Sequence, residues 1–482
     1  MNLSKLLENL KQYQVYNFRE LDIKGITCDS RKVKNNFIFV VIRGIKEDGT
    51  KYLSEAIQRG AKAVVYEEFP SLEKGVVGIK VKNARRAYSH LCAEFYHNPS
   101  LNLKVVGVTG TNGKTTITYL IEKILKIKNR PALLIGTINY HYKNKIILAH
   151  NTTPSAEELQ FLLSQAKKER IEYAVMEVSS HALAQGRVDD IYFSYAIFTN
   201  LTQDHLDYHR NMEEYFQAKA KLLHLLKPEG KAIINIDDFY GRRLLKVCRY
   251  PIITYGLNKK ADIYADCIEY SIKGTDFILH TPKNKIKMHT SLLGTHNIYN
   301  ILAGVGFALE ENTDLGDVKK AISEFKPPPG RLEKVYDKDF AVFVDYAHTP
   351  SALENVLSVL RKVTKKRIIL VFGCGGERDR LKRPKMGKIA TELAEEVIVT
   401  SDNPRSEDPL LIIKEIISGI KKKNYKVILE RKEAIFSALK EAKKQDIVLV
   451  AGKGHENYQI IKDRVIPFND AKIIREYFKN KQ

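Results

Sequence analysis

One short segment constrains the fold of this chain more than any other. Residues 105–108 read as the end of a buried strand, and residues 117–127 carry apolar side chains at helical spacing. Between them runs Thr-Gly-Thr-Asn-Gly-Lys-Thr-Thr, residues 109–116. Glycines let backbone N–H groups curl around phosphate oxygens, and the N-terminus of a helix adds favourable partial charge. The segment predicts a phosphate-binding loop (P-loop) of shortened form, because Val108 stands where the general pattern has its first glycine.

The side chains of this loop suit ATP and a divalent cation. Lys114 is expected to reach the terminal phosphates, and Thr115 is expected to hold Mg²⁺. The other loop residues expected to contact ATP are Gly110, Thr111, Asn112, Gly113 and Thr116. An ordinary strand-to-helix turn is the alternative, but Gly-Lys-Thr directly after a strand is what phosphate binding requires.

The composition is typical of a soluble protein with several domains. The chain has 482 residues, 44% hydrophobic and 28% charged, and no apolar run approaches the roughly 20 residues of a membrane span. Its formal net charge is +22, but the lysines are spread along the whole chain without interleaved aromatic residues. A solvated, lysine-rich surface explains this charge better than a nucleic-acid partner does.

Two features indicate a cytoplasmic location. The segment 1–19 is amphipathic and lacks the apolar core of a signal peptide. The five cysteines are scattered along the chain and show no metal-type spacing. We therefore expect them to be reduced thiols, which are typical of cytoplasmic proteins.

Three α/β domains are predicted. Residues 1–98 hold short strands and helices. Residues 99–329 alternate apolar runs, such as 103–108 and 132–135, with helical segments, and this alternation predicts a mostly parallel sheet covered on both faces. A stiff Pro-Pro-Pro-Gly break precedes a second alternating block, residues 330–482.

The last block places polar stretches directly after its predicted strands. These stretches are 345–348, 373–378, 402–405 and 452–456. Ligands of parallel sheets bind outside the carboxyl ends of the strands. Four such stretches at one sheet edge therefore indicate one shared site.

Acidic and imidazole side chains follow two strands of the central block. Glu177 ends a predicted strand near the P-loop and suits Mg²⁺, although a solvated strand-end acid is the alternative. The Asp- and His-rich segment 200–209 suggests a second metal site, although each histidine alone is more often structural. Composition alone makes Lys219, on the next helix, a surface residue.

Together, these motifs resemble the Mur ligase family. The resemblance rests on residues 110–116, 177–181, 200–209, 218–219, 294–300, 330–331 and 345–348, in the family's order and at its familiar spacing. The resemblance spans all three predicted domains. It implies a small uridine-nucleotide domain, a central P-loop ATPase-like domain with a mostly parallel sheet, and a Rossmann-like C-terminal domain.

The resemblance implies an ATP-dependent amide ligase of peptidoglycan precursor synthesis. ATP would phosphorylate the D-Glu γ-carboxylate of UDP-N-acetylmuramoyl-L-alanyl-D-glutamate, and an amine would then displace phosphate. Because the ATP phosphates and the substrate carboxylate are both anions, Lys114 and two Mg²⁺ ions would supply the positive charge that lets them meet. By resemblance, Thr115 and Glu177 bind one magnesium and His205 helps to bind the other. Lys219 matches the family's carbamylated lysine, N6-carboxylysine, an anion that can ligate Mg²⁺; this reverses the interpretation from composition.

The resemblance also implies substrate contacts. Those to ATP outside the P-loop are Asn297, Asn300, Arg331, Asp345 and His348. Those to the nucleotide-peptide substrate are Ser30, Asn151, Thr152, Thr153, Ser179, Gln185 and Arg187. Without the family context, helix-cap asparagines are the alternative for these two residues. The chain departs from many relatives at residues 48–50, where Asp-Gly-Thr replaces Asp-Gly-His; this concerns the nucleotide contacts rather than the chemistry.

The acceptor amino acid is inferred from residues 402–405, Asp-Asn-Pro-Arg. Family members that add meso-diaminopimelate carry this motif, and members that add L-lysine usually lack its arginine. Arg405 can bind the additional carboxylate of diaminopimelate with two hydrogen bonds. A loop that leads into a helix is the alternative. The other implied contacts to the amino acid are Arg378, Asp402, Asn403, Pro404, Gly452 and Glu456.

Three other functions stay open. An L-lysine-adding ligase would share the chemistry. A folate-polyglutamating ligase would share the P-loop and the carbamylated lysine. Residues 27–31 and 43–44, which resemble the uridine-diphosphate site of the Mur ligase family, and the Asp-Asn-Pro-Arg motif both argue against it. A nucleic-acid-dependent P-loop ATPase rests on net charge alone. We expect a monomer whose partners are ATP, meso-diaminopimelate and the nucleotide-peptide, with no nucleic acid and no membrane span.

Overall fold

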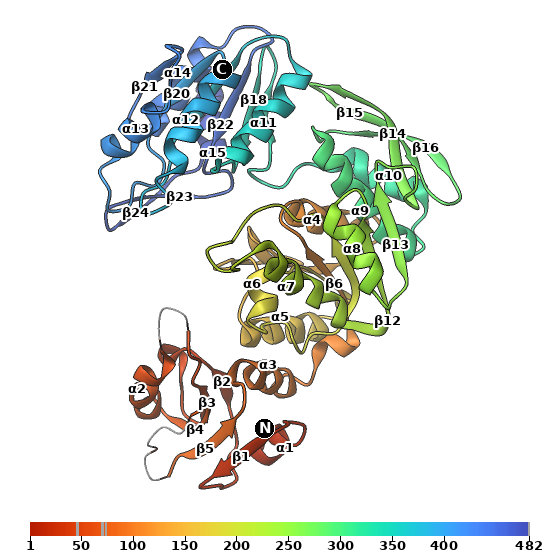
Figure 1. Cartoon of the computed structure of the whole chain (residues 1–482), viewed down its shortest axis with the longest axis vertical. Coiled ribbons are helices and arrows are strands. Elements are labelled where there is room, and N and C mark those ends of the chain that lie inside the picture. The colour runs from red at the N-terminus through yellow and green to blue at the C-terminus, as the bar shows by residue number, and fades with distance from the viewer. Residues whose placement is uncertain (45–47, 69–71, 73–74, 481–482) are drawn as a thin grey trace. The chain divides into compact units, whose positions relative to one another are not determined.

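The computed structural model describes residues 1–44, 48–68, 72 and 75–480. It divides into two compact units, the first comprising Met1–Tyr264 with Tyr299–Val318 and the second Ala265–Ile298 with Lys319–Gln482. Figure 1 labels the elements along the chain. The unit boundaries fall within or beside β14 (Ile263–Ser271), α9 (Thr295–Glu310) and α10 (Leu315–Glu324). The three-domain boundaries drawn from the sequence stay a prediction.

The N-terminal part of the first unit is a small α/β layer. Its strand order is β1-β5-β4-β3-β2, with β2 to β5 parallel and β1 antiparallel to β5. Because side chains alternate along a strand, Ile38 and Val40 pack with α1 and α3, whereas Phe39 packs with α2. The bounds are α1 Leu3–Leu7, β1 Tyr13–Tyr16, β2 Gly25–Thr27, β3 Phe37–Val40, α2 Leu53–Gln58, β4 Ala61–Tyr66, β5 Val77–Val81 and α3 Ala84–Phe95.

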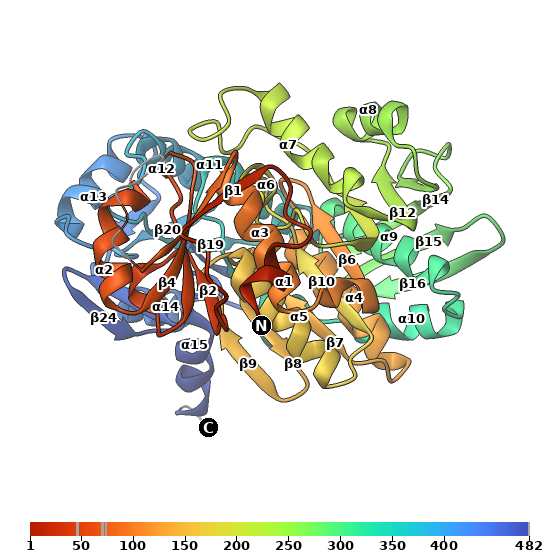
Figure 2. The ribbon, with the colours of Figure 1, turned by 90° about the horizontal axis from the view of Figure 1, so that it is seen from below.

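A larger sheet organises the rest of the first unit. Its strands follow the order β13-β12-β11-β6-β10-β7-β8-β9 and are parallel from β13 to β7. The edge β7–β8–β9, which Figure 2 shows from below, is antiparallel. Every residue of β7 and β10 is buried, as expected of a parallel sheet covered on both faces.

The bounds of these elements follow the chain. They are β6 Lys104–Thr109, α4 Lys114–Ile127, β7 Ala132–Ile135, β8 Asn139–Tyr142, β9 Lys145–Leu148, α5 Ala156–Lys168, β10 Tyr173–Glu177, α6 Ser180–Ala184, β11 Phe193–Phe198, α7 Met212–His224, β12 Leu226–Asn235, α8 Phe239–Val247 and β13 Ile252–Gly256. The predicted strand 132–135 coincides with β7, and the predicted strand 103–108 is displaced by one residue from β6.

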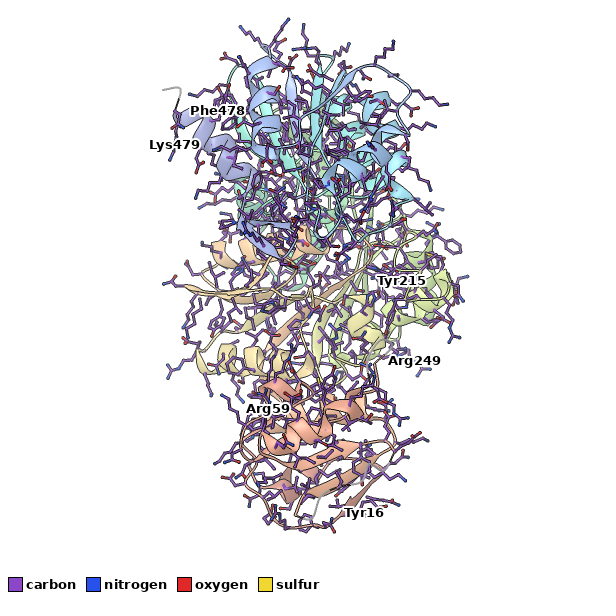
Figure 3. The ribbon with its side chains drawn as sticks, turned by 90° about the vertical axis from the view of Figure 1, so that its left-hand side faces the viewer. Tyr16, Arg59, Tyr215, Arg249, Phe478 and Lys479 are labelled. Atoms are coloured by element: carbon purple, nitrogen blue, oxygen red, sulfur yellow. The ribbon has the colours of Figure 1, made fainter. Side chains whose placement is uncertain are left out.

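The second unit is built on a sheet of order β17-β18-β22-β19-β20-β21, parallel except for β17. Two apolar cores lie on its faces, one with α11, α12 and α13 and the other with α14 and α15. Near the C-terminus, the Phe478 ring, labelled in Figure 3, stacks on Tyr336 at 3.6 Å. The α/β class and the largely parallel sheets predicted from the sequence are confirmed.

The bounds in this unit are β15 Gly274–His280, β16 Lys285–Thr290, β17 Glu333–Asp337, β18 Ala341–Asp345, α11 Pro350–Val363, β19 Ile368–Phe372, α12 Lys382–Leu393, β20 Glu396–Val399, α13 Pro409–Ile417, β21 Tyr425–Val427, α14 Arg431–Glu441, β22 Ile447–Ala451, β23 Tyr458–Ile461, β24 Arg464–Pro467 and α15 Asp470–Lys479. The pairs β15–β16 and β23–β24 are antiparallel hairpins. None of the helices in the described ranges combines the length and apolarity that a bilayer crossing requires.

Candidate active site

The P-loop joins the end of β6 to the start of α4, as the sequence predicts. Gly110 has φ 142° and Gly113 has φ 91°. A Cβ atom at Gly110 would lie 1.8 Å from Thr199 Oγ1, and one at Gly113 would lie 2.3 Å from Asn300 Oδ1. Only glycine fits these two positions. The second contact also places Asn300, a predicted ATP residue, against the loop.

The rest of the loop is held by its neighbours. Thr111 N donates to Asn200 O at 2.8 Å, and Asn112 N donates to Asn200 Oδ1 at 3.0 Å. Thr115 and Thr116 are buried in the first turn of α4. Asn200, which the sequence marked only as part of the segment 200–209, therefore fixes the outer half of the P-loop.

Asn297 lies one turn before Asn300 on α9. Its Nδ2 donates to the backbone oxygen of Leu293 at 2.8 Å. The amide donates here to a carbonyl of the preceding residues, whereas a helix cap accepts from a backbone N–H group, so this contact does not decide between the two roles considered for Asn297. The role of Asn297 toward adenine stays a prediction.

Two lysines meet at one carbonyl of the P-loop. Lys114 Nζ donates to Gly110 O and Thr111 O, both at 2.9 Å, and Lys219 Nζ donates to the same Gly110 O at 2.8 Å. Lys219 is 2% exposed, so the surface position inferred from composition is wrong. Burial, and then the positive charge of Lys114, holds the pKa of Lys219 well below its ordinary value.

Tyr215 connects this lysine to the loop. It lies one helical turn before Lys219 on α7, with its ring 4.7 Å from Lys219 Nζ and its hydroxyl 3.2 Å from Thr111 Oγ1. Its position on α7 is labelled in Figure 3. The sequence signal for this residue was only its helical spacing from Lys219.

Three imidazoles gather beside Tyr215. The His181 ring lies 4.9 Å from that of His205 and 5.7 Å from that of His209. Burial and then the positive charge of the neighbouring imidazoles together lower the pKa of His181 to about 4. His205 is 46% exposed and has φ 53°, whereas His209 is buried. The segment 200–209 thus brings one accessible histidine, His205, to the edge of the P-loop region.

Glu177 is a buried acid rather than a solvated one. It is 1% exposed, and its two oxygens accept from Thr137 N at 2.8 Å and from Thr137 Oγ1 at 3.1 Å. In the sheet it is paired with Val108, two residues before Gly110. The strand-end carboxylate therefore lies beside the strand that leads into the P-loop.

The oxygen-rich donor set at this edge fits magnesium. The Thr115 hydroxyl and the buried Glu177 carboxylate are ligands of the kind that Mg²⁺ prefers. Among the described residues, no group of three or more His, Cys, Asp or Glu side chains is arranged to hold a metal. The predicted ligand set, Thr115, Glu177, His205 and carbamylated Lys219, contains only two such side chains and stays a prediction.

Most residues predicted for the nucleotide-peptide form one network. Thr153 Oγ1 donates to Glu177 O at 2.9 Å and accepts from Ser179 N at 3.0 Å. Arg187 Nη1 donates to Thr153 O at 2.9 Å, and its Nε donates to Gln185 Oε1 at 2.9 Å. This network therefore adjoins the end of β10 that carries the Glu177 carboxylate.

The remaining predicted contacts to this substrate lie on both sides of that network. Thr152 Oγ1 lies 3.1 Å from Thr137 Oγ1, and Asn151 O accepts from Tyr140 Oη at 2.6 Å. Ser30 lies apart, in a short 3-10 helix between β2 and β3 of the N-terminal layer, where its hydroxyl donates to Glu55 Oε2 at 2.7 Å. Thr137 was not predicted, because a single threonine in a turn carries no sequence signal.

The four polar stretches of the C-terminal block lie at one edge of the β17–β21 sheet. Gly452 N donates to Asp345 O at 3.1 Å, and Gly376 N donates to Asn403 O at 2.9 Å. A Cβ at Gly452 would lie 2.7 Å from Asp402 Oδ2. The shared edge inferred from strand-end positions is thus present.

Arg405 and Glu456 stand in this edge with different partners. Arg405 Nη1 donates to Gly376 O at 2.6 Å, and its backbone has φ 53°. Glu456 Oε2 accepts from Asn403 Nδ2 at 2.8 Å. Pro404, between Asn403 and Arg405 in the chain, is buried, and Arg378 is exposed. The arginine and the carboxylate offer the opposite charges that an amino-acid head group requires.

A cationic and aromatic cluster completes this edge. The Arg331 guanidinium lies 5.4 Å from the Tyr346 ring, which lies 4.6 Å from His348 and 4.9 Å from His455. Asp345 accepts from the backbone N–H groups of residues 332 and 347. Burial raises the pKa of Asp345 to about 6 and lowers that of His348.

Three family models match the chain in sequence. They are "Mur ligase family, catalytic domain" over residues 22–96, "Mur ligase middle domain" over residues 108–308 and "Mur ligase, glutamate ligase domain" over residues 330–454. A relative from Clostridium botulinum, a UDP-N-acetylmuramoyl-L-alanyl-D-glutamate–2,6-diaminopimelate ligase, is 44% identical over 99% of this chain and 100% of its own length. The chain belongs to the Mur ligase family.

Other relatives of this Mur ligase carry the same name. One from Syntrophomonas wolfei is 43% identical over the full length of both chains. A solved structure of a ligase so named is 33% identical and covers 95% of each chain, with a TM-score of 0.71. The Mur ligase architecture predicted from the motifs is therefore confirmed.

Proposed function

We propose that this Mur ligase joins meso-diaminopimelate to the D-Glu γ-carboxylate of UDP-N-acetylmuramoyl-L-alanyl-D-glutamate, with cleavage of ATP to ADP and phosphate. The structural observation that carries this reaction is the buried Lys219 amine on Gly110 of the P-loop. The full-length relatives named for diaminopimelate support the acceptor, as does Arg405 in a site that also contains Glu456.

The first step transfers the γ-phosphoryl group of ATP to an oxygen of the D-Glu carboxylate, and ADP leaves. Lys114 would leave the loop carbonyls that it now contacts and bind the phosphates, offsetting their negative charge. Bound Mg²⁺ would add electrostatic stabilisation, held by Thr115, Glu177, His205 and carbamylated Lys219. Asn300 would contact the nucleotide from the helix that borders Gly113.

The second step forms the amide. The amine nitrogen of the acceptor attacks the acyl carbon, loses a proton, and inorganic phosphate leaves from the tetrahedral intermediate. The network of Thr153, Ser179 and Arg187 would hold the peptide so that its carboxylate stays beside β10. At the C-terminal edge, Arg405 would bind the second carboxylate of diaminopimelate and Glu456 its ammonium group.

Carbamylation of Lys219 is part of this proposal. Only a neutral amine attacks CO₂, giving a carbamate and a proton, and burial favours the neutral amine at this position. Lys219→Ala should therefore lose turnover, and short carboxylates should restore part of it by replacing the carbamate. Intact mass in CO₂-rich buffer should show the adduct on wild type and not on this variant.

The decisive experiment measures ADP release and product mass with each candidate acceptor. We expect ADP release only when ATP, Mg²⁺, the nucleotide-dipeptide and meso-diaminopimelate are all present, together with a product one residue longer. Turnover with L-lysine but not with meso-diaminopimelate would refute the acceptor. ATP hydrolysis stimulated by DNA or RNA instead would refute the ligase.

Two further properties belong to the proposal. We infer a monomeric enzyme that works in the cytoplasm, where ATP and the nucleotide-linked substrate are available. Sedimentation at working concentration tests the first property, and cell fractionation tests the second.

A further inference from the structure

The C-terminal edge contains a buried lysine to which the proposed reaction assigns no role. Lys453 lies in the turn after β22, with its side chain 0% exposed. Its Nζ donates to Asn403 Oδ1 at 3.0 Å and pairs with Glu456 Oε2 at 3.1 Å. A fully buried lysine is rare unless it is paired. Both of its partners are residues predicted to bind the amino acid.

The orientation of the Asn403 amide is fixed by two donors. Its Oδ1 accepts from Lys453 Nζ and also from Ile460 N at 3.0 Å. An amide has an acceptor end and a donor end. The Nδ2 end must therefore face away from these donors, and it donates to Glu456 Oε2 at 2.8 Å.

The Glu456 carboxylate is thus held through one of its two oxygens. Lys453 and Asn403 both bind Oε2, whereas no hydrogen bond from the described residues reaches Oε1. The Glu456 side chain keeps 17% of its surface exposed. Its second oxygen is available for a cationic group of a ligand, and the carboxylate cannot turn without breaking two hydrogen bonds.

The same hairpin that fixes Asn403 also holds Arg405. Ile460 belongs to β23, and its backbone oxygen accepts from Arg405 N at 3.1 Å. Arg405 O in turn accepts from Lys462 N at 2.7 Å. Arg405, Asn403 and Glu456 are therefore held in a fixed relation, with Lys453 at the buried side of the arrangement.

We propose that Lys453 is a positioning residue of the amino-acid site. It holds the Asn403 amide and the Glu456 carboxylate in the single arrangement that receives the ammonium group of the acceptor's amino-acid head. Without its charge, the carboxylate would lose its buried counter-ion and the amide would lose one of the two donors that orient it. This inference rests on the proposed function, because it takes this edge to be the acceptor site.

The test compares steady-state kinetics of four variants with wild type. Lys453→Met keeps the side-chain length and removes the charge, Glu456→Gln removes the carboxylate charge, and a third variant combines both. The matched control is Lys334→Met, which loses an ion pair to Asp337 at 2.9 Å and a hydrogen bond to a backbone oxygen in the same unit. All variants are checked for folding by thermal unfolding.

We expect Lys453→Met to raise the KM for meso-diaminopimelate by roughly tenfold to a hundredfold, as for loss of one partner of a buried charge pair. Its kcat and its KM for ATP should stay within about twofold of wild type, because the change affects binding of one substrate. The Lys334→Met control should change none of these constants. The double variant should resemble the more impaired single variant, since both changes act through one carboxylate.

Three results would overturn the inference. The first is an unchanged KM for diaminopimelate in Lys453→Met. The second is a double variant whose KM for diaminopimelate rises by the product of the two single-variant effects. The third is a rise of kcat, of the KM for ATP and of the KM for diaminopimelate together. If Lys453→Met fails to fold, Lys453→Gln replaces it; failure of both to fold would assign the lysine to stability alone and likewise overturn positioning. A wild-type enzyme inactive with meso-diaminopimelate would instead refute the proposed function, before any variant is compared.

Discussion

Replacing Lys219 by methionine should make the protein more stable and inactive at once. The side chain is buried, and the only hydrogen bond found for its amine within the described ranges goes to Gly110 O. Burial shifts its pKa well below the ordinary 10.5. In the unfolded chain the same amine regains its ordinary pKa and binds a proton near neutral pH. Folding therefore acts against the protonated form of this group, a cost that methionine does not carry.

The structure gives a magnitude for this change. Each unit by which burial lowers the pKa of the folded amine below its ordinary 10.5 costs about 1.4 kcal/mol of folding free energy in buffer where that amine is neutral. Losing the hydrogen bond to Gly110 offsets about 1 kcal/mol of the gain. Because the pKa of Lys219 lies well below 10.5, this cost exceeds the lost hydrogen bond, and Lys219→Met should be more stable than wild type in CO₂-free buffer.

The sign of the pH dependence follows from linkage. Above the folded pKa and below 10.5, the unfolded state binds more protons, so wild-type stability rises with pH relative to the variant. The advantage of Lys219→Met should shrink by about 1.4 kcal/mol for each pH unit. Urea unfolding followed by circular dichroism at pH 7.5 and 9 measures it, and ADP release measures activity. A variant less stable than wild type at pH 7.5, or an advantage independent of pH, would refute the reasoning.

Three further predictions concern other parts of the site. Gly110→Ala should destabilise the first unit by about 2–4 kcal/mol in urea unfolding and should raise the KM for ATP. The reasons are the positive φ of this residue and the displacement of the Thr199 hydroxyl by the new Cβ atom. An unchanged free energy of unfolding and an unchanged KM for ATP would contradict the loop geometry. Arg405→Ala should raise the KM for meso-diaminopimelate by roughly a hundredfold and Arg405→Lys should restore little, because a bidentate contact needs the guanidinium; full rescue by lysine would contradict it. Asp345, with its pKa raised to about 6 by burial, should make wild type lose up to about 3 kcal/mol relative to Asp345→Asn as pH rises from about 4 to about 6; parallel stability curves would contradict that shift.

Buried parallel strands were predictable because their signal is local. Strands such as β7 and β19 are continuous apolar runs bounded by polar turns, so hydrophobicity alone finds them. The hairpin β23–β24 was not predicted. Its segments are short and β24 is wholly exposed, so no pattern of buried residues distinguishes them from a loop.

The site residues also divide into those with a local sequence signal and those without one. The P-loop was readable because Gly110 and Gly113 satisfy local backbone requirements that only glycine meets. Lys219 and Lys453 were not, since burial of a lysine depends on what the fold brings around it and composition makes every lysine a surface residue. Family resemblance corrected Lys219. It gave no role to Lys453, whose partners became visible only with the structure.

The hairpin β23–β24 has a consequence for anyone who wishes to re-engineer acceptor choice. The backbone of Arg405 is clamped between Ile460 and Lys462, residues more than fifty positions downstream. Grafting residues 402–405 alone into a lysine-adding enzyme would transfer the arginine without the hairpin that holds its backbone in place. An exchange of acceptor preference therefore has to include both segments, the tetrapeptide and the hairpin β23–β24, in the same chimaera.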